Sequence, residues 1–193
     1  MKICSEEGKV YVAGVDVGSL STDTVIMDEE RNIVNYNVLF TGASSRRAAR
    51  RSYEETLCAA GLREEDISFT VSTGYGREVV PFAHTQVTEI SCHARGAHFF
   101  FPDTRTVIDV GGQDSKVIRV NAQGQVIDFA MNEKCAAGTG RFLEVMARAL
   151  EIELEEMGER SLRAKKPVPI SSMCTVFAES EVVSRIAEGH PIE

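Results

Sequence analysis

Apolar residues in the first part of the chain occur in short blocks separated by polar turns, a pattern typical of β-strands. The expected strands are residues 9–17, 22–27 and 33–40, with a polar turn at residues 28–32. Ala49, Tyr53 and Leu57 then recur at helical spacing, which predicts a helix over residues 45–60. Gly61 is well placed to end that helix.

A second series of the same kind follows in the later part of the chain. After a strand at residues 67–72 and a helix at 88–100, we expect strands at residues 106–110, 116–120 and 126–130. Helical spacing then returns after Phe142 and again within residues 173–186. The sequence therefore predicts an α/β protein with two related domains, residues 1–104 and 105–193.

The composition narrows the class of protein. The chain has 193 residues, of which 43% are hydrophobic and 26% charged, as in ordinary globular proteins. Its net charge of −8 argues against nucleic acid or an anionic membrane as partner. No apolar run approaches the roughly 20 residues of a membrane helix, and the N-terminus lacks a signal-peptide core. Five cysteines without a framework spacing favour a reducing cytoplasm.

The first strand of each series ends in an Asp-x-Gly turn. Glycine lets backbone N–H groups approach an anion, and the carboxylate can hold hydrated Mg²⁺. One such turn could equally be an ordinary hairpin turn. The two aspartates, however, are 93 positions apart, and a duplicated turn favours a pair of phosphate loops that grip one nucleotide. The residues concerned are Asp16, Gly18 and Ser19 in the first turn and Asp109, Gly111 and Gly112 in the second.

Two cysteines precede the two late helical segments. Cys135 lies in MNEKCAAGTGRF (residues 131–142), and Cys174 opens a similar segment. A helix N-terminus favours the thiolate form, which iron–sulfur clusters and zinc require. A 4Fe–4S cluster needs four thiolates, so a two-fold dimer would have to supply the second pair. The spacing alone leaves open that both are buried free cysteines.

We expect the other three cysteines to lie away from this pair and to be dispensable. Cys4 falls in the N-terminal segment, whereas Cys58 and Cys92 fall on helices of the first domain. Cys58 is predicted to pack in the core with the apolar residues of its helix.

The segments NEKCAAGTGRFLEVMA and CTVFAESEVVS closely resemble the activator (activase) family of 2-hydroxyacyl-CoA dehydratases and benzoyl-CoA reductases, which are ATPases of the BadF/BadG/BcrA/BcrD type. The resemblance runs from about Val10 to the end of the chain. It implies the α/β superfold of actin, heat-shock chaperones and acetate and sugar kinases, with duplicated β-β-β-α-β-α units of which the second is incomplete. It also places Gln113 and Asp114 in the second phosphate loop, where they would orient water or Mg²⁺.

The resemblance implies a function as well. In this family Cys135 and Cys174 of each subunit would hold one 4Fe–4S cluster between the subunits of a homodimer. ATP hydrolysis would then drive a low-potential electron to an acyl-CoA dehydratase or reductase, with reduced ferredoxin or flavodoxin as the donor. Two alternatives remain: a small-molecule kinase with the same phosphate cleft, and a nucleotide-gated interaction protein without redox chemistry. The loop at residues 73–77 offers no carboxylate base for a kinase, although Glu78 and Glu89 are near.

The sequence departs from the family in two respects. Leu20 and Asp23 stand where members often carry Thr and Lys, which makes the first phosphate loop less cationic. The chain also stops at Glu193, before the expected adenine-binding turn and the last helix that packs on the first domain. We therefore expect a fragment, or a chain completed by a partner, and no adenine pocket is assigned.

Overall fold

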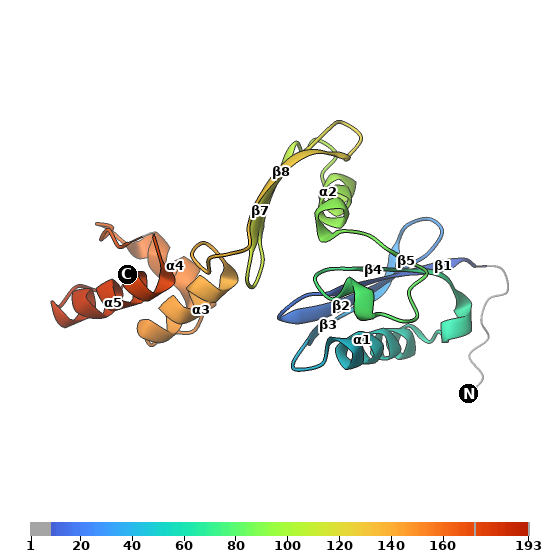
Figure 1. The fold of residues 1–193 in the computed structure, drawn as a ribbon, viewed down its shortest axis with the longest axis horizontal. Coiled ribbons are helices and arrows are strands. Elements are labelled where there is room, and N and C mark those ends of the chain that lie inside the picture. The colour runs from blue at the N-terminus through green and yellow to red at the C-terminus, as the bar shows by residue number, and fades with distance from the viewer. Residues whose placement is uncertain (1–8, 172, 193) are drawn as a thin grey trace. The chain divides into compact units, whose positions relative to one another are not determined.

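The computed structural model describes residues 9–171 and 173–192, which form two compact units (Figure 1). The first unit runs up to Asp103 and includes Gln123–Gln125, whereas the second comprises Thr104–Ala122 and the chain from Val126 onward. Cys4 lies outside the described residues. Within them, no helix is both long and apolar enough to cross a membrane.

The first unit is built on a five-stranded sheet in the order β3-β2-β1-β4-β5. Its strands are β1 (Tyr11–Val17), β2 (Ser21–Met27), β3 (Ile33–Phe40), β4 (Ile67–Thr73) and β5 (Thr85–Gln86). The first three strands form an antiparallel meander, and β4 lies parallel to β1. The helices are α1 (Ser45–Ala60) and α2 (Glu89–Phe100), with short 3₁₀ turns at Glu64–Asp66 and Arg77–Val79.

The core of the first unit lies between α1 and one face of this sheet. Alternate residues of β1, among them Val15 and Val17, are fully buried toward the helix, because side chains alternate between the two faces of a strand. Tyr53 of α1 is only 2% exposed and stacks on Phe82 with 4.6 Å between the ring centroids. Gly61 ends α1 in the left-handed region at φ 69°, as its position predicts.

Cys58 is exposed, so its predicted place in the core is wrong. The buried stripe of α1 includes Tyr53 and Leu57. Each residue turns the helix by about 100°, which carries Cys58 off that stripe and onto the side of Arg51 and Glu55. The prediction relied on the apolar character of cysteine, but the position of a residue along the helix decides which face it lies on.

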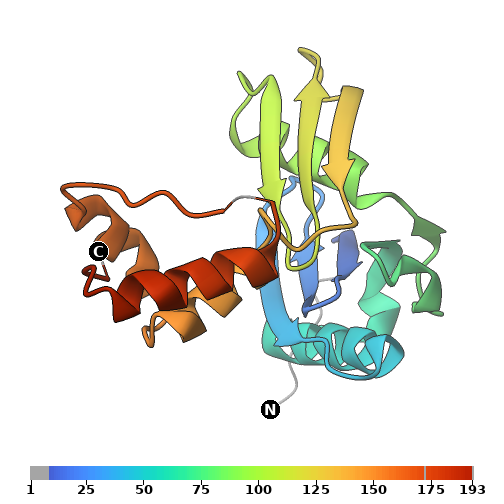
Figure 2. The same ribbon diagram turned by 60° about the vertical axis from the view of Figure 1, so that its left-hand side comes forward.

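The second unit combines a three-stranded antiparallel sheet with three helices. The strands are β6 (Thr106–Val110), β7 (Ser115–Val120) and β8 (Val126–Asn132), in sequence order across the sheet, and the helices are α3 (Gly140–Ala149), α4 (Glu156–Arg163) and α5 (Thr175–Ala187). Helices α3 and α5 lie side by side (Figure 2), because Met146 packs against Ala178 and Val182 in a small apolar core.

Helix α4 was not predicted from the sequence. Its eight residues, EMGERSLR, include a glycine and few apolar side chains, and Leu162 is 88% exposed. Ion pairs at i,i+4 lie along its surface, at 3.3 Å for both Arg160–Glu156 and Arg163–Glu159. Such pairs support a short helix whose apolar side is provided mainly by Met157, which packs against the core of Met146, Ala178 and Val182.

We predict that Tyr53→Ala lowers the free energy of unfolding of the first unit by about 3–5 kcal/mol, because it leaves a cavity against Phe82 and removes the ring contact. The matched control on the same helix is Cys58→Ala, expected to change stability by less than about 0.5 kcal/mol, since this side chain is exposed. Urea denaturation followed by circular dichroism measures both. Equal destabilisation by the two variants would contradict this description of the core.

Candidate functional site

The first phosphate loop is a tight turn between β1 and β2. The N–H of Gly18 donates to the carbonyl of Ser21 at 2.9 Å, and the Thr41 hydroxyl donates to the carbonyl of Gly18 at 3.0 Å. A Cβ at Gly18 would come within 2.9 Å of that same Ser21 carbonyl. Glycine is therefore required for the turn that follows Asp16.

The loop after β4 packs directly against Asp16. Gly74 has φ 85°, and a Cβ there would lie 2.2 Å from Asp16 Oδ1. The N–H of Gly76 donates to the carbonyl of Val17 at 2.8 Å. In the sequence the loop at residues 73–77 was considered only as a place for a kinase base and was not assigned to the first site. β4 runs parallel to β1, so the carboxyl ends of both strands meet at one edge of the sheet, and this pairing leaves no signal in the sequence.

A buried lysine organises the second phosphate loop, and sequence analysis missed it. Lys116 is 4% exposed, and its Nζ donates to Asp114 Oδ1 at 2.9 Å and to Asp109 Oδ2 at 3.3 Å. Burial alone lowers the pKa of Lys116, but the hydrogen bonds to Asp114 and Asp109 outweigh it and leave the pKa above its ordinary value. The ammonium therefore stays charged and holds two predicted site carboxylates together, while Gln113 between them in the chain is exposed.

The same loop is joined to the start of α3. The N–H of Gly140 donates to the carbonyl of Gly111 at 2.8 Å, and the N–H of Arg141 donates to that of Gly112 at 3.0 Å. A side chain at Gly140 would be tight, because its Cβ would lie 3.3 Å from the Gly111 oxygen. The Gly-Thr-Gly turn after Cys135 thus allows α3 to approach the phosphate loop closely.

Asn132, at the end of β8, holds the segment that carries Cys135. Its Nδ2 donates to the carbonyls of Cys135 at 2.8 Å and Ala137 at 3.2 Å, and its Oδ1 accepts from the N–H of Cys135 at 3.2 Å. Thr139, which is fully buried, is the N-cap residue of α3. Cys135 therefore lies in a fixed loop four positions before that N-cap.

Cys174 is the N-cap residue of α5, where its carbonyl accepts from the N–H of Ala178 at 3.0 Å. Cys135 and Cys174 both belong to the second unit, and both are free and half-buried. Among residues 9–171 and 173–192, no three His, Cys, Asp or Glu side chains gather as a set of metal ligands.

The first unit contains a pocket of about 560 Å³ on the sheet face opposite α1. Its polar lining includes Asp16, Asp23, Thr73 and Cys92, and the rest of the lining is mainly apolar. Burial raises the pKa of Asp23, and a hydrogen bond from Ser21 offsets this only in part. Burial also raises the pKa of the Cys92 thiol.

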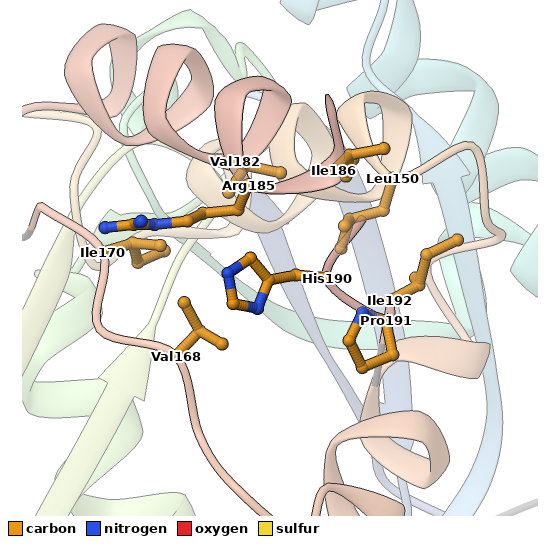
Figure 3. A pocket seen from close by; sticks show the side chains of 9 residues that line it. All are labelled: Leu150, Val168, Ile170, Val182, Arg185, Ile186, His190, Pro191 and Ile192. Carbon is orange, nitrogen blue, oxygen red and sulfur yellow. The ribbon is translucent and has the colours of Figure 1, made fainter. Parts of the chain in front are cut away.

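The second unit contains a smaller cavity of about 150 Å³ (Figure 3). The His190 ring lies among Val168, Leu150 and Ile186, with the Arg185 side chain on one side. None of the site residues predicted from the sequence lines this cavity.

Comparisons with known proteins show the family and the fold of this chain. The profile of the BadF/BadG/BcrA/BcrD ATPase family matches residues 13–192. The activator of lactoyl-CoA dehydratase from Anaerotignum propionicum is 51% identical over 180 residues, which is 93% of this chain and 69% of that protein.

Two solved structures are also similar. Component A of (R)-2-hydroxyglutaryl-CoA dehydratase from Acidaminococcus fermentans matches with a TM-score of 0.89 and 45% identity, over 94% of this chain and 70% of the other. The activator of 2-hydroxyisocaproyl-CoA dehydratase from Clostridium difficile, solved with bound ADPNP, matches with a TM-score of 0.87 and 45% identity, over 94% and 68% of the two chains.

These matches confirm the resemblance found in the sequence and the expected α/β fold of the actin-like ATPase superfold. The protein belongs to the BadF/BadG/BcrA/BcrD ATPase family.

Proposed function

We propose that this protein is an ATP-dependent activator that delivers a low-potential electron to a 2-hydroxyacyl-CoA dehydratase or a related acyl-CoA reductase. The observation that carries the proposal is the pair of hydrogen bonds between the Gly111–Gly112 carbonyls and the first amides of α3. They connect a loop with the chemistry of a phosphate site to the segment that carries Cys135. The names of the similar dehydratase activators support the choice of partner.

ATP is the expected nucleotide, and the residues of both loops suit it. The backbone at Gly18 and Ser19, and at Gly111 and Gly112, can approach phosphate oxygens, because glycine has no side chain and that of Ser19 is a small hydroxymethyl. Asp16 and Asp109 would hold Mg²⁺ through water, and Asp114 and Gln113 would orient water near the terminal phosphate. Lys116 keeps Asp109 and Asp114 at one place and provides positive charge beside them.

The thiols of Cys135 and Cys174 suit a 4Fe–4S cluster. Both are free, half-buried and carried by one unit, and Cys174 is the N-cap residue of α5. Because the cluster needs four thiolates, a homodimer would supply two from each chain. When bound, the cluster would store one electron of low potential, supplied by reduced ferredoxin or flavodoxin.

Hydrolysis of ATP can drive this uphill transfer only if the nucleotide and the cysteines are mechanically connected. Movement of the Gly111–Gly112 backbone would pull on α3, because two of its first amides are bonded to that backbone. Asn132 would pass part of that movement to Cys135, whose carbonyl and N–H it binds. In this scheme ATP would change the surroundings of the cysteines and the access of the partner enzyme.

We predict that Asp16→Asn and Asp109→Asn each lower the kcat of ATP hydrolysis in the intact protein by about 100-fold or more, because each removes a charge that positions Mg²⁺ and phosphate. At position 109 asparagine keeps an oxygen for Lys116, and circular dichroism should show an intact fold in both variants. Asp128→Asn, an exposed residue of β8, is the control and should hydrolyse ATP normally. Normal hydrolysis in both site variants would contradict the assignment of the two loops.

We also predict that Cys135→Ser or Cys174→Ser abolishes the cluster and the activation of the partner enzyme while much of the ATPase activity remains. Protein purified without oxygen should be brown in the wild type, with four iron and four sulfide per dimer. The exposed thiol gives the matched control Cys58→Ser, which should keep both colour and metal content. Full iron content in either site variant would refute the role of these two cysteines.

A further inference from the structure

The carbonyl of Gly18 is held from inside the first unit by a buried threonine. Thr41, which follows β3, is 6% exposed, and its hydroxyl donates to this carbonyl at 3.0 Å. The N–H of Thr41 also donates to the carbonyl of Leu20 at 2.8 Å. One residue from outside the β1–β2 turn therefore binds two of its carbonyls, and only one of these bonds uses a side chain.

A second buried threonine continues this contact. Thr22, on β2, is fully buried, and its hydroxyl lies 2.9 Å from that of Thr41. A hydroxyl has one hydrogen, and Thr41 gives its hydrogen to Gly18, so Thr22 is the donor in the threonine pair. The result is a directed chain of hydrogen bonds that runs from Thr22 through Thr41 to the Gly18 carbonyl. In such a chain each bond polarises the next.

This chain fixes the direction of the peptide group between Gly18 and Ser19. The described residues contain no cis peptide bond, so the Ser19 N–H points away from the Gly18 carbonyl and hence away from Thr41. Ser19 is exposed, and in the part of the chain that the structure describes its N–H donates to no backbone carbonyl. The N–H of Gly18, in contrast, donates to the Ser21 carbonyl. Of these two amides, the Ser19 N–H is therefore the one open to an anion.

We propose that Thr41 and Thr22 are positioning residues of the first phosphate loop. They orient the Gly18–Ser19 peptide so that the Ser19 N–H faces a phosphate oxygen of the nucleotide, and they strengthen this donor by polarising the peptide. The inference rests on the proposed function, because the anion concerned is the triphosphate of ATP. Neither hydroxyl contacts the nucleotide, since both are buried behind the turn and act through the Gly18 carbonyl.

The test compares substitutions of similar shape in the intact protein. Thr41→Val removes the hydroxyl but keeps the backbone bond to Leu20, whereas Thr41→Ser keeps both. The matched control is Thr24→Val on β2. Thr24 is 1% exposed, and its hydroxyl pairs with that of Ser52 at 2.8 Å, away from the turn. Both valine variants lose a buried hydrogen bond and should have a lower Tm, but only Thr41→Val should weaken nucleotide binding.

Calorimetric titration with Mg²⁺ and the analogue ADPNP gives the first readout. Thr41→Val should raise the Kd at least about tenfold and Thr22→Val about twofold to fivefold, whereas Thr41→Ser and Thr24→Val should stay within about twofold of the wild type. A wild type that binds no nucleotide would overturn the proposed function, and this inference with it. A wild type that binds ADPNP, together with an unchanged Kd in Thr41→Val, overturns this inference alone.

The second readout needs no nucleotide. The dipeptide Gly-Ser occurs once in the sequence, so ¹³C at glycine carbonyls combined with ¹⁵N at serine isolates one amide signal, that of the Gly18–Ser19 peptide. Thr41→Val should move its proton resonance upfield in the free protein, because a carbonyl without its donor leaves the N–H less polarised. Thr24→Val should leave the resonance in place. An unchanged Ser19 signal in Thr41→Val would mean that the hydroxyl chain does not control this peptide, and the inference would be wrong.

Discussion

The second unit depends on the use of the α3 amides as donors to the phosphate loop. The first N–H groups of a helix have no partner within the helix, and a free helix start would offer them to water or to an anion. Here Gly140 and Arg141 donate to the carbonyls of Gly111 and Gly112. The start of α3 is therefore fixed to the β6–β7 turn, and the segment between β8 and α3 must close the remaining distance. Asn132 and Thr139 hold that segment in place, Asn132 through hydrogen bonds to Cys135 and Thr139 as the N-cap residue of α3.

The two hairpins of the internal duplication share one backbone arrangement but differ in the charge of the residue opposite the aspartate. Both hairpins place an aspartate at the end of the first strand and a charged residue opposite it. In the second unit Lys116 compensates the carboxylates within the chain. In the first unit the residue opposite Asp16 is Asp23, so this hairpin carries two carboxylates where the other carries an ion pair. Nucleotide binding at the two loops would consequently respond differently to salt and to divalent cations.

The two cysteines make the proposed cluster depend on the association of two chains. In the proposed dimer each chain would contribute Cys135 and Cys174, because the described residues of one chain include no group of three or more His, Cys, Asp or Glu side chains that could hold a metal. A cluster shared between two chains would be sensitive to the position of α3 and α5, which pack together through Met146, Ala178 and Val182. An apolar helix pair of this kind can transmit a displacement as a unit, because close-packed side chains resist independent movement.

The sequence by itself determined most of the local structure and the class of the protein. The apolar period gave the helix Ser45–Ala60 and the two three-stranded series, because burial on one face imposes a period of 3.6 or 2 residues. The duplicated turns and the cysteine segments indicated the family, which the comparisons confirm. Helical spacing places Cys58 away from Tyr53 and Leu57, so its exposure was already implied by the sequence. Only the tertiary structure showed that Gly74 packs on Asp16 and that Lys116 joins Asp109 to Asp114. Both depend on strand register and on loops that meet at a sheet edge. Contacts between residues on different strands leave no period along the chain, so they become visible only when the strands are paired.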